Sequence, residues 1–184
     1  MRLVILGGSG SGKSTQAQRL CGNFDIPQIS TGEMLREAIA NVSDLGRYAQ
    51  PYVTKGELVP DEIMIECIRL QLKKPEVNQG WVLEGYPRTA FQAEELDFLL
   101  DDLGQKLDWA IYLQVPQAIM VSRSLERSLQ DDQPEIVQRR VELFYDRTIP
   151  ILEYYDRRRR LLTINGDQLP EMVQQNISTL LSTP

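Results

Sequence analysis

Nine residues near the start of the chain have the composition of a phosphate-binding loop. Residues 7–15 read Gly-Gly-Ser-Gly-Ser-Gly-Lys-Ser-Thr and directly follow the apolar run 3–6. Glycine permits left-handed backbone conformations, so successive N–H groups can point into one concavity at the start of a helix and bind an anion. In this pattern Lys13 reaches the outer phosphates and the Ser14 hydroxyl binds Mg²⁺. The loop predicts a nucleoside triphosphate site, which alone does not define a reaction; a flexible Gly/Ser loop is the alternative.

A second group of polar residues follows the apolar segment 81–83. Residues 84–89 read Glu-Gly-Tyr-Pro-Arg-Thr, and polar groups at the carboxyl end of a parallel strand face the ligand crevice. Arg36 and Arg88 carry guanidinium forks that match phosphate groups in geometry. Taken singly, each of these arginines could equally make a surface salt bridge.

The net charge of the chain argues against a nucleic-acid binder. The 184 residues include 20 Lys and Arg against 26 Asp and Glu, a net charge of −6, so the basic footprint of such proteins is missing. The run 157–160 is all arginine and closes a helix-like stretch, where we expect it to be solvated. The chain has no histidine, the usual general base, so its chemistry must depend on phosphate positioning and electrostatics.

Cysteine usage and hydropathy indicate the compartment. Cys21 and Cys67 lie far apart in the sequence without metal-ligand spacing. We therefore expect two core thiols in a reducing compartment, not a zinc site or a disulfide. No apolar stretch approaches the length of a membrane helix, and the amino terminus leads directly into an apolar strand. We expect a cytoplasmic protein that binds neither membranes nor nucleic acid.

The pattern of apolar residues predicts strands that alternate with helices. The expected strands are 3–6, 28–29, 81–83, 109–113 and 161–164. Helices are expected after the phosphate loop, from Ser30 or Thr31 to about 40, at 45–55, at 61–72, after Thr89, at 116–125, after Asp132 with a kink at Pro150, and from about Pro170. Residues 30–59 would form a helical hairpin that overhangs the phosphate loop. The alternation indicates an α/β domain with a parallel sheet.

Three helix ends have recognisable local signals. Thr89 and Gln92 have the spacing of a capping box, and so do Asp132 and Glu135. Gly56 follows the helix expected at 45–55 and suits a left-handed C-terminal cap.

The spacing of several motifs together resembles the adenylate kinase family over essentially the whole chain. The resembling segments are the phosphate loop, 30–36, 56–61 and 85–92. This resemblance implies a P-loop NTPase-type five-stranded parallel sheet flanked by helices in a single domain. Within it, the core would comprise 1–29, 60–122 and 134–184, with a nucleoside-monophosphate-binding insertion at 30–59 and a short lid at 123–133.

The resemblance also implies a reaction and the residues that perform it. The reaction is MgATP plus AMP to two ADP, by a protein that we expect to be a monomer. ATP-binding roles are implied for Gly8, Ser9, Gly10, Ser11, Gly12, Lys13, Ser14, Thr15, Arg123, Arg127 and Gly166. AMP-binding roles are implied for Thr31, Arg36, Glu57, Val59, Gly85, Arg88, Gln92 and Arg140. The implied catalytic residues are Lys13, Arg88, Arg123 and Arg140, and Ser14 with Glu84, acting through water, would hold Mg²⁺.

In this family resemblance Thr31 lies near the adenine, Arg36 and Arg88 bind the AMP phosphate, and Gln92 contacts the adenine edge. The amide of Gln92 presents a donor beside an acceptor, which is the complement of the adenine amino group and ring nitrogen. Two alternatives remain: a kinase for UMP or CMP, and a nucleotide-sensing module with weakened catalysis.

Several residues depart from the family pattern. Ser9 replaces a proline, Ser14 a glycine and Glu84 an aspartate. The lid resembles the family in Arg123, Arg127, Asp131–Asp132 and Arg140, but Leu129 occupies the position of a lid arginine. We expect either a slow enzyme that Leu129→Arg would accelerate, or a rewired lid in which Arg127 has taken over the vacant role.

Overall fold

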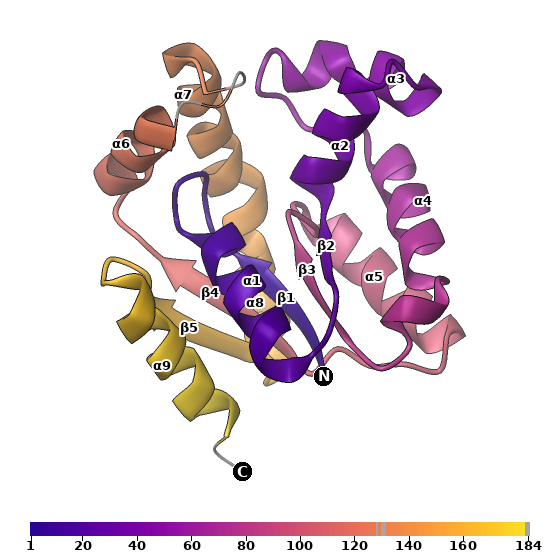
Figure 1. Cartoon of the computed structure of the whole chain (residues 1–184), viewed down its shortest axis with the longest axis vertical. Helices are drawn as coiled ribbons and strands as arrows, with labels where there is room; N and C mark the ends of the chain where they lie inside the picture. Colours follow the sequence, from indigo (N-terminus) through magenta and orange to yellow (C-terminus); the bar gives the residue numbers. More distant parts are fainter. Residues whose placement is uncertain (128, 130–131, 183–184) are drawn as a thin grey trace.

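The computed structural model describes residues 1–127, 129 and 132–182, and its centre is a five-stranded parallel sheet. The strands are β1 (Arg2–Leu6), β2 (Gln28–Ser30), β3 (Trp81–Glu84), β4 (Trp109–Gln114) and β5 (Leu161–Asn165). Their order is β2-β3-β1-β4-β5, with every pair parallel. The predicted parallel α/β architecture is confirmed, and β1 is central, so the loop after it opens between the ends of β3 and β4 (Figure 1).

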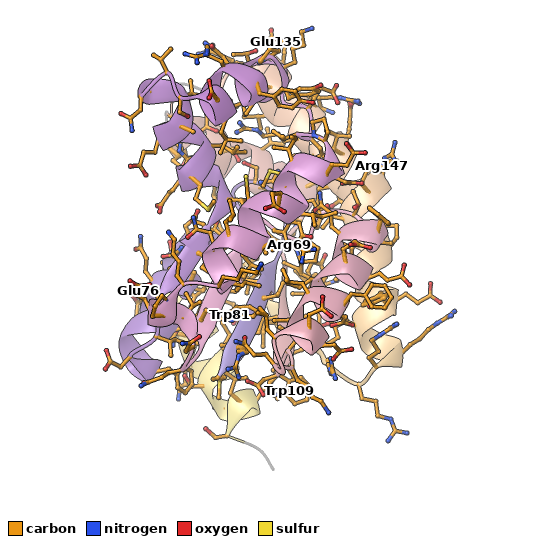
Figure 2. The ribbon with its side chains drawn as sticks, turned by 90° about the vertical axis from the view of Figure 1, so that its right-hand side faces the viewer. Arg69, Glu76, Trp81, Trp109, Glu135 and Arg147 are labelled. Atoms are coloured by element: carbon orange, nitrogen blue, oxygen red, sulfur yellow. The ribbon has the colours of Figure 1, made fainter. Side chains whose placement is uncertain are left out.

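Alternate residues of the strands face two separate apolar layers. Leu3 and Ile5 pack with α1 (Lys13–Phe24) and α9 (Pro170–Leu181). Val4 and Leu6 pack on the other face, with α4 (Asp61–Leu72), α5 (Ala90–Asp102) and α8 (Ile149–Arg157). Figure 2 looks onto this second face, with α4 and α5 in front of the sheet. Helices therefore cover both faces of the sheet, and a binding site can form at the polar ends of its strands.

Two helical units lie above the carboxyl ends of the strands (Figure 1). One is the predicted hairpin, α2 (Thr31–Ala40) and α3 (Asp44–Val53), whose helices are capped by the hydroxyls of Ser30 and Ser43. A Cβ on Gly46 would come within 2.0 Å of the Ala38 carbonyl oxygen, so only glycine allows this approach of the two helices. The other unit is α6 (Gln117–Arg127) with α7 (Pro134–Leu143).

Some local predictions were wrong in detail. The helix expected to continue from Asp132 through a kink at Pro150 is divided into α7, a π-helical turn (Phe144–Thr148) and α8. Asp132 does not cap α7, because Gln133 precedes that helix and the Asp132 carboxylate binds side chains elsewhere.

The other helix-end signals were mostly correct. Gly56 has the predicted left-handed conformation, with φ of 71°, although α3 ends at Val53. The Thr89 hydroxyl accepts the Gln92 N–H as a capping box requires, but the Gln92 side chain accepts from the N–H of Arg88 and not of Thr89.

The structure also shows the environment of the two cysteines and of the arginine run 157–160. Cys21 and Cys67 are half-buried, not core residues, and burial raises the pKa of both thiols, that of Cys21 to about 11. In the run 157–160, Arg158 stacks on the Tyr154 ring, 3.5 Å from its centroid, at the exposed end of α8. Within the part of the chain that the structure describes, no helix combines the length and apolarity needed to cross a membrane.

Candidate functional site

The phosphate loop lies between β1 and the start of α1 and opens into a cleft of about 380 Å³. Gly10 and Gly12 have φ of 79° and 91°, which a side chain would strain. A Cβ on Gly10 would also lie 2.1 Å from the Met120 carbonyl oxygen. The loop can therefore pack directly against α6 only because residue 10 is glycine.

Lys13 is the first residue of α1 and points back into the loop, where its Nζ donates to the Gly8 carbonyl at 2.6 Å. Burial lowers the Lys13 pKa to about 8, and the nearby Arg88, Arg127 and Arg140 add to this effect, while Glu84 opposes it. The pKa of Arg88 is also below its usual value, through burial first and then through Arg140 and Arg36. The cleft thus concentrates cations whose repulsion a polyphosphate would relieve.

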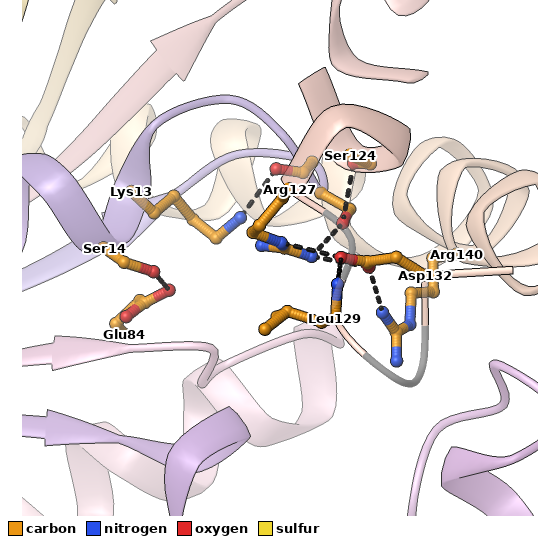
Figure 3. A network of polar contacts seen from close by, with 10 residues as sticks. Lys13, Ser14, Glu84, Ser124, Arg127, Leu129, Asp132 and Arg140 are labelled. Carbon is orange, nitrogen blue, oxygen red and sulfur yellow. Dashed lines mark hydrogen bonds and ion pairs between the residues drawn. The ribbon is translucent and has the colours of Figure 1, made fainter. Parts of the chain in front are cut away.

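Glu84 ends β3 beside the loop and is 9 % exposed. The Ser14 hydroxyl donates to its Oε1 at 2.8 Å, and the Gln28 side-chain amide donates to its Oε2 at 3.1 Å. Gln28 pairs with Val82, two residues before Glu84, so the register places Gln28 and Glu84 on the same face of neighbouring strands. Figure 3 shows Ser14 and Glu84 facing each other next to Lys13.

The opposite half of the cleft contains the predicted acceptor residues. Thr31, Arg36, Glu57, Val59, Gly85, Arg88 and Gln92 all line it. Thr31 is buried and approaches the Glu84 carbonyl oxygen at 3.4 Å. A Cβ on Gly85 would lie 2.3 Å from the Thr31 hydroxyl, so glycine is required after β3. Arg88 folds over this turn, and its Nε donates to the Gly85 carbonyl at 2.8 Å.

Three arginines enter the cleft from α6 and α7. Arg123 and Arg127 are one turn apart on α6, and Arg140 comes from α7. Arg127 forms a two-pronged contact with the Asp132 carboxylate, with Nε–Oδ2 2.9 Å and Nη2–Oδ1 2.7 Å, and Arg140 Nη1 lies 3.4 Å from Oδ1 (Figure 3). One carboxylate therefore orients two arginines from two helices. Asp131, the other half of the expected acidic pair, lies outside the described residues.

Leu129, where the family resemblance places an arginine, joins this group through its backbone. Its N–H donates to Asp132 Oδ2 at 3.2 Å (Figure 3). Ser9, another departure, is 3.1 Å from the Ser124 hydroxyl and 3.5 Å from Arg127 Nη2. Two of the departures, Ser9 and Leu129, are thus linked through Arg127 and Asp132, whereas the other two, Ser14 and Glu84, contact each other at the end of β3.

Two predicted ATP residues lie in a neighbouring hollow of about 400 Å³ on the other side of the loop. Ser11 and Gly166 line only this hollow, whereas Gly12, Thr15 and Arg123 border both spaces. Arg123 donates to the Gly166 carbonyl at 3.2 Å and to Asp167 Oδ1 at 3.1 Å. The remaining predicted loop residues, Gly8, Ser9, Gly10, Gly12, Lys13, Ser14 and Thr15, line the main cleft.

Several polar residues that contact this site were not predicted from the sequence. Gln28 binds Glu84, Asp61 binds the Gln92 amide, and Arg139 binds both carboxylate oxygens of Glu57, at 2.7 and 3.1 Å. The signal for Asp61 was its place at the end of the resembling segment 56–61, within which it had been given no role. Arg139 shares no sequence pattern with Glu57 that could have indicated their contact.

Comparisons with known proteins agree with this geometry. A family model described as adenylate kinase matches residues 5–160. Adenylate kinase 2 of Nostoc sp. strain PCC 7120 is 81% identical, over 98% of both chains. Adenylate kinase 2 of Synechocystis sp. strain PCC 6803 is 56% identical, over 94% of this chain and 98% of the other. The adenylate kinase of Xanthomonas euvesicatoria pv. vesicatoria strain 85-10 is 40% identical, over 98% and 99%.

Proposed function

The chain belongs to the adenylate kinase family and interconverts ATP plus AMP with two ADP, and we propose that the residues of the central cleft perform this reaction with Mg²⁺. The central cleft is the observation that supports these residue roles. It joins the phosphate loop and Lys13 to an acceptor half containing Thr31, Val59 and Gln92, with arginines between them. ATP would bind through the loop and the Arg123 side, and AMP through the acceptor half.

The chemistry requires positioning and charge more than proton transfer. An oxygen of the AMP phosphate attacks the γ-phosphorus of ATP, the bond from that phosphorus to the bridging oxygen breaks, and ADP leaves. The acceptor oxygen is already ionised, so no general base is needed, which fits a chain without histidine. Lys13, Arg88, Arg123 and Arg140 would stabilise the charge that spreads over the transferred group, with Arg127 beside them.

The residues near the loop fit a magnesium ion. Mg²⁺ prefers oxygen ligands and keeps several waters. The Ser14 hydroxyl and the Glu84 carboxylate supply oxygens 2.8 Å apart at the mouth of the loop. We propose that Ser14 binds the ion directly and Glu84 through water, with Gln28 holding the longer carboxylate in place. When bound, the ion would neutralise phosphate charge during transfer.

We propose that three parts of the chain share this work. The core comprises 1–29, 60–122 and 134–184, the insertion at 30–59 holds AMP, and the lid at 123–133 supplies arginines. We propose that the protein is a monomer, and the half-buried cysteines without a disulfide support a reducing, cytoplasmic location.

A coupled assay of ADP formation tests the proposed roles. With ATP as donor, AMP should be used well ahead of UMP and CMP, because uracil presents an N–H beside a carbonyl and cytosine, which shares adenine's acceptor and donor pair, has a smaller ring that extends less far toward Gln92. Lys13→Ala should abolish turnover without lowering the unfolding temperature. Near wild-type turnover by this variant would show that Lys13 does not act on the phosphates.

A further inference from the structure

Asp61 holds the side-chain amide of Gln92 in one orientation. Gln92 is 2 % exposed, and its Nε2 donates to Asp61 Oδ1 at 2.7 Å. On the other side its Oε1 accepts from the Arg88 N–H at 2.8 Å. A carboxylate can only accept and a backbone N–H can only donate, so both neighbours require the same arrangement of the amide. Gln92 lines the cleft, whereas Asp61 lies behind it and does not.

The Asp61 carboxylate lies where the first turns of α4 and α5 meet. Asp61 is the first residue of α4, where a negative charge suits the helix dipole. Thr89, the cap of α5, approaches Asp61 Oδ1 at 3.5 Å with its hydroxyl and accepts the Gln92 N–H at 3.1 Å. Asp61 is thus one of the two groups that orient the amide. Without it, only the Arg88 N–H would remain to do so.

The fixed amide has one N–H and one oxygen lone pair left for a ligand. Adenine presents a ring-nitrogen acceptor beside an amino donor, which complements this arrangement. A 6-oxopurine presents an N–H donor beside a carbonyl acceptor and needs the amide turned over. Turned over, Oε1 of Gln92 would face the Asp61 carboxylate and Nε2 would face the Arg88 N–H, so both present hydrogen bonds would be lost.

We propose that Asp61 is a positioning residue that makes the acceptor site prefer adenosine monophosphate to 6-oxopurine monophosphates. It acts by holding Gln92 in the orientation that adenine requires. This inference rests on the proposed contact of Gln92 with AMP.

The test compares three variants with AMP and with inosine monophosphate as acceptors. Asp61→Asn keeps the shape of the side chain but can donate as well as accept, so it tolerates the turned amide. The AMP-to-IMP ratio of kcat/KM should fall by about tenfold, the equivalent of one ordinary hydrogen bond, with the KM for ATP unchanged. Glu62→Gln removes the same charge from the same turn of α4 and should keep the wild-type ratio.

The outcomes separate the inference from the function on which it rests. If Gln92→Leu raises the KM for AMP but Asp61→Asn keeps the wild-type ratio, Asp61 has no positioning role. If Gln92→Leu leaves the KM for AMP unchanged, the proposed AMP contact itself is wrong.

Nuclear magnetic resonance of the wild-type protein gives a second test that needs no variant to fold. With AMP bound, both Nε2 protons of Gln92 should be hydrogen-bonded, one to Asp61 and one to adenine, so both should resonate downfield of free amides and exchange slowly. If the proton that faces Asp61 has the shift and exchange rate of a free amide, the proposal is overturned; if only the proton that faces adenine does, the proposed AMP contact is wrong instead.

Discussion

At the scale of single residues, Lys13 is a cation whose charge depends on what the cleft contains. Burial and the neighbouring arginines lower its pKa to about 8. Bound phosphates would raise that pKa again, because an opposite charge favours the protonated amine. The free protein therefore loses this proton at a lower pH than the ATP complex does.

ATP binding should consequently take up a proton at alkaline pH. Above about pH 8 the free protein has lost much of the Lys13 proton, so the affinity for ATP should decline as pH rises from there toward the pKa of the complex. Titration calorimetry at pH 8.5 in buffers of different ionisation enthalpy should show uptake of roughly half a proton or more. Lys13→Met should bind without this uptake, and a wild-type heat that is independent of the buffer would contradict the assignment.

Leu129 marks the point at which the lid differs from the family resemblance. Its N–H and the side chains of Arg127 and Arg140 all contact Asp132, so the carboxylate is already occupied. This arrangement favours the rewired lid over the impaired one. Leu129→Arg should change kcat by less than about threefold, whereas Arg127→Ala should lower it by about 10²- to 10³-fold, somewhat less than the loss of a sole arginine on the phosphoryl group. A large gain from Leu129→Arg would restore the impaired-lid hypothesis.

At the scale of elements, one ion pair joins the 30–59 insertion to α7. Arg139 contacts both oxygens of Glu57, and the Glu57 pKa is lowered by this hydrogen bonding. The two side chains are 42 % and 38 % exposed, so the pair adds little to folding stability, and its effect should appear in the relative motion of the two elements.

Removing this ion pair should change the rate of ADP release but have little effect on the free energy of unfolding. Glu57→Gln should change the free energy of unfolding by less than about 1 kcal/mol. It should increase the rate of ADP release a few-fold, because the insertion is no longer held to α7. Stopped-flow measurement of ADP release provides the readout, with Glu142→Gln as the control, since Glu142 contacts Arg139 from within α7. Equal release rates in all three proteins would show that the pair does not restrain the insertion.

At the scale of the whole molecule, the chain is acidic, with a net charge of −6, yet its cleft is lined with cations. Burial of these cations, together with their mutual repulsion, costs stability in the absence of an anion, as the lowered pKa values of Lys13 and Arg88 indicate. An anion that binds only the folded protein adds to its stability.

Inorganic phosphate should therefore raise the unfolding temperature more than chloride at equal ionic strength. A gain of about 1 kcal/mol corresponds to roughly 2–4 °C for a protein of this size. Scanning calorimetry should show this rise in the wild type and in Arg157→Gln, which alters the exposed end of α8. The rise should be smaller in Lys13→Ala. Equal rises in all three would place phosphate binding outside the cleft.

Sequence patterns predicted those structural features that depend on residues close together in the chain. The strands follow from short apolar runs, the loop from its glycines, and the caps of α2 and α5 from Ser30 and Thr89. These features depend on neighbours within a few residues of the chain. The positions of the predicted cleft residues then followed from parallel strands whose carboxyl ends share one edge.

The unpredicted contacts join residues that are distant in the sequence. Asp61 and Gln92 are 31 positions apart, and Glu57 and Arg139 are 82 apart. No periodicity or motif relates such residues, because their meeting depends on how α4, α5 and α7 pack. Asp132 was assigned to a cap for the same reason: its local spacing fitted one, but the arginines of α6 and α7 compete for its carboxylate.

The glycine at the crossing of α2 and α3 determines how the insertion can be observed. Because backbone meets backbone at Gly46 and Ala38, the two helices cannot slide without collision and behave as one lever. The two helices should therefore move together as one rigid unit, and a single distance should describe that movement. One pair of fluorophores, on the exposed Tyr48 of α3 and the exposed Leu70 of α4, would therefore follow the opening of the proposed AMP site through a complete catalytic cycle.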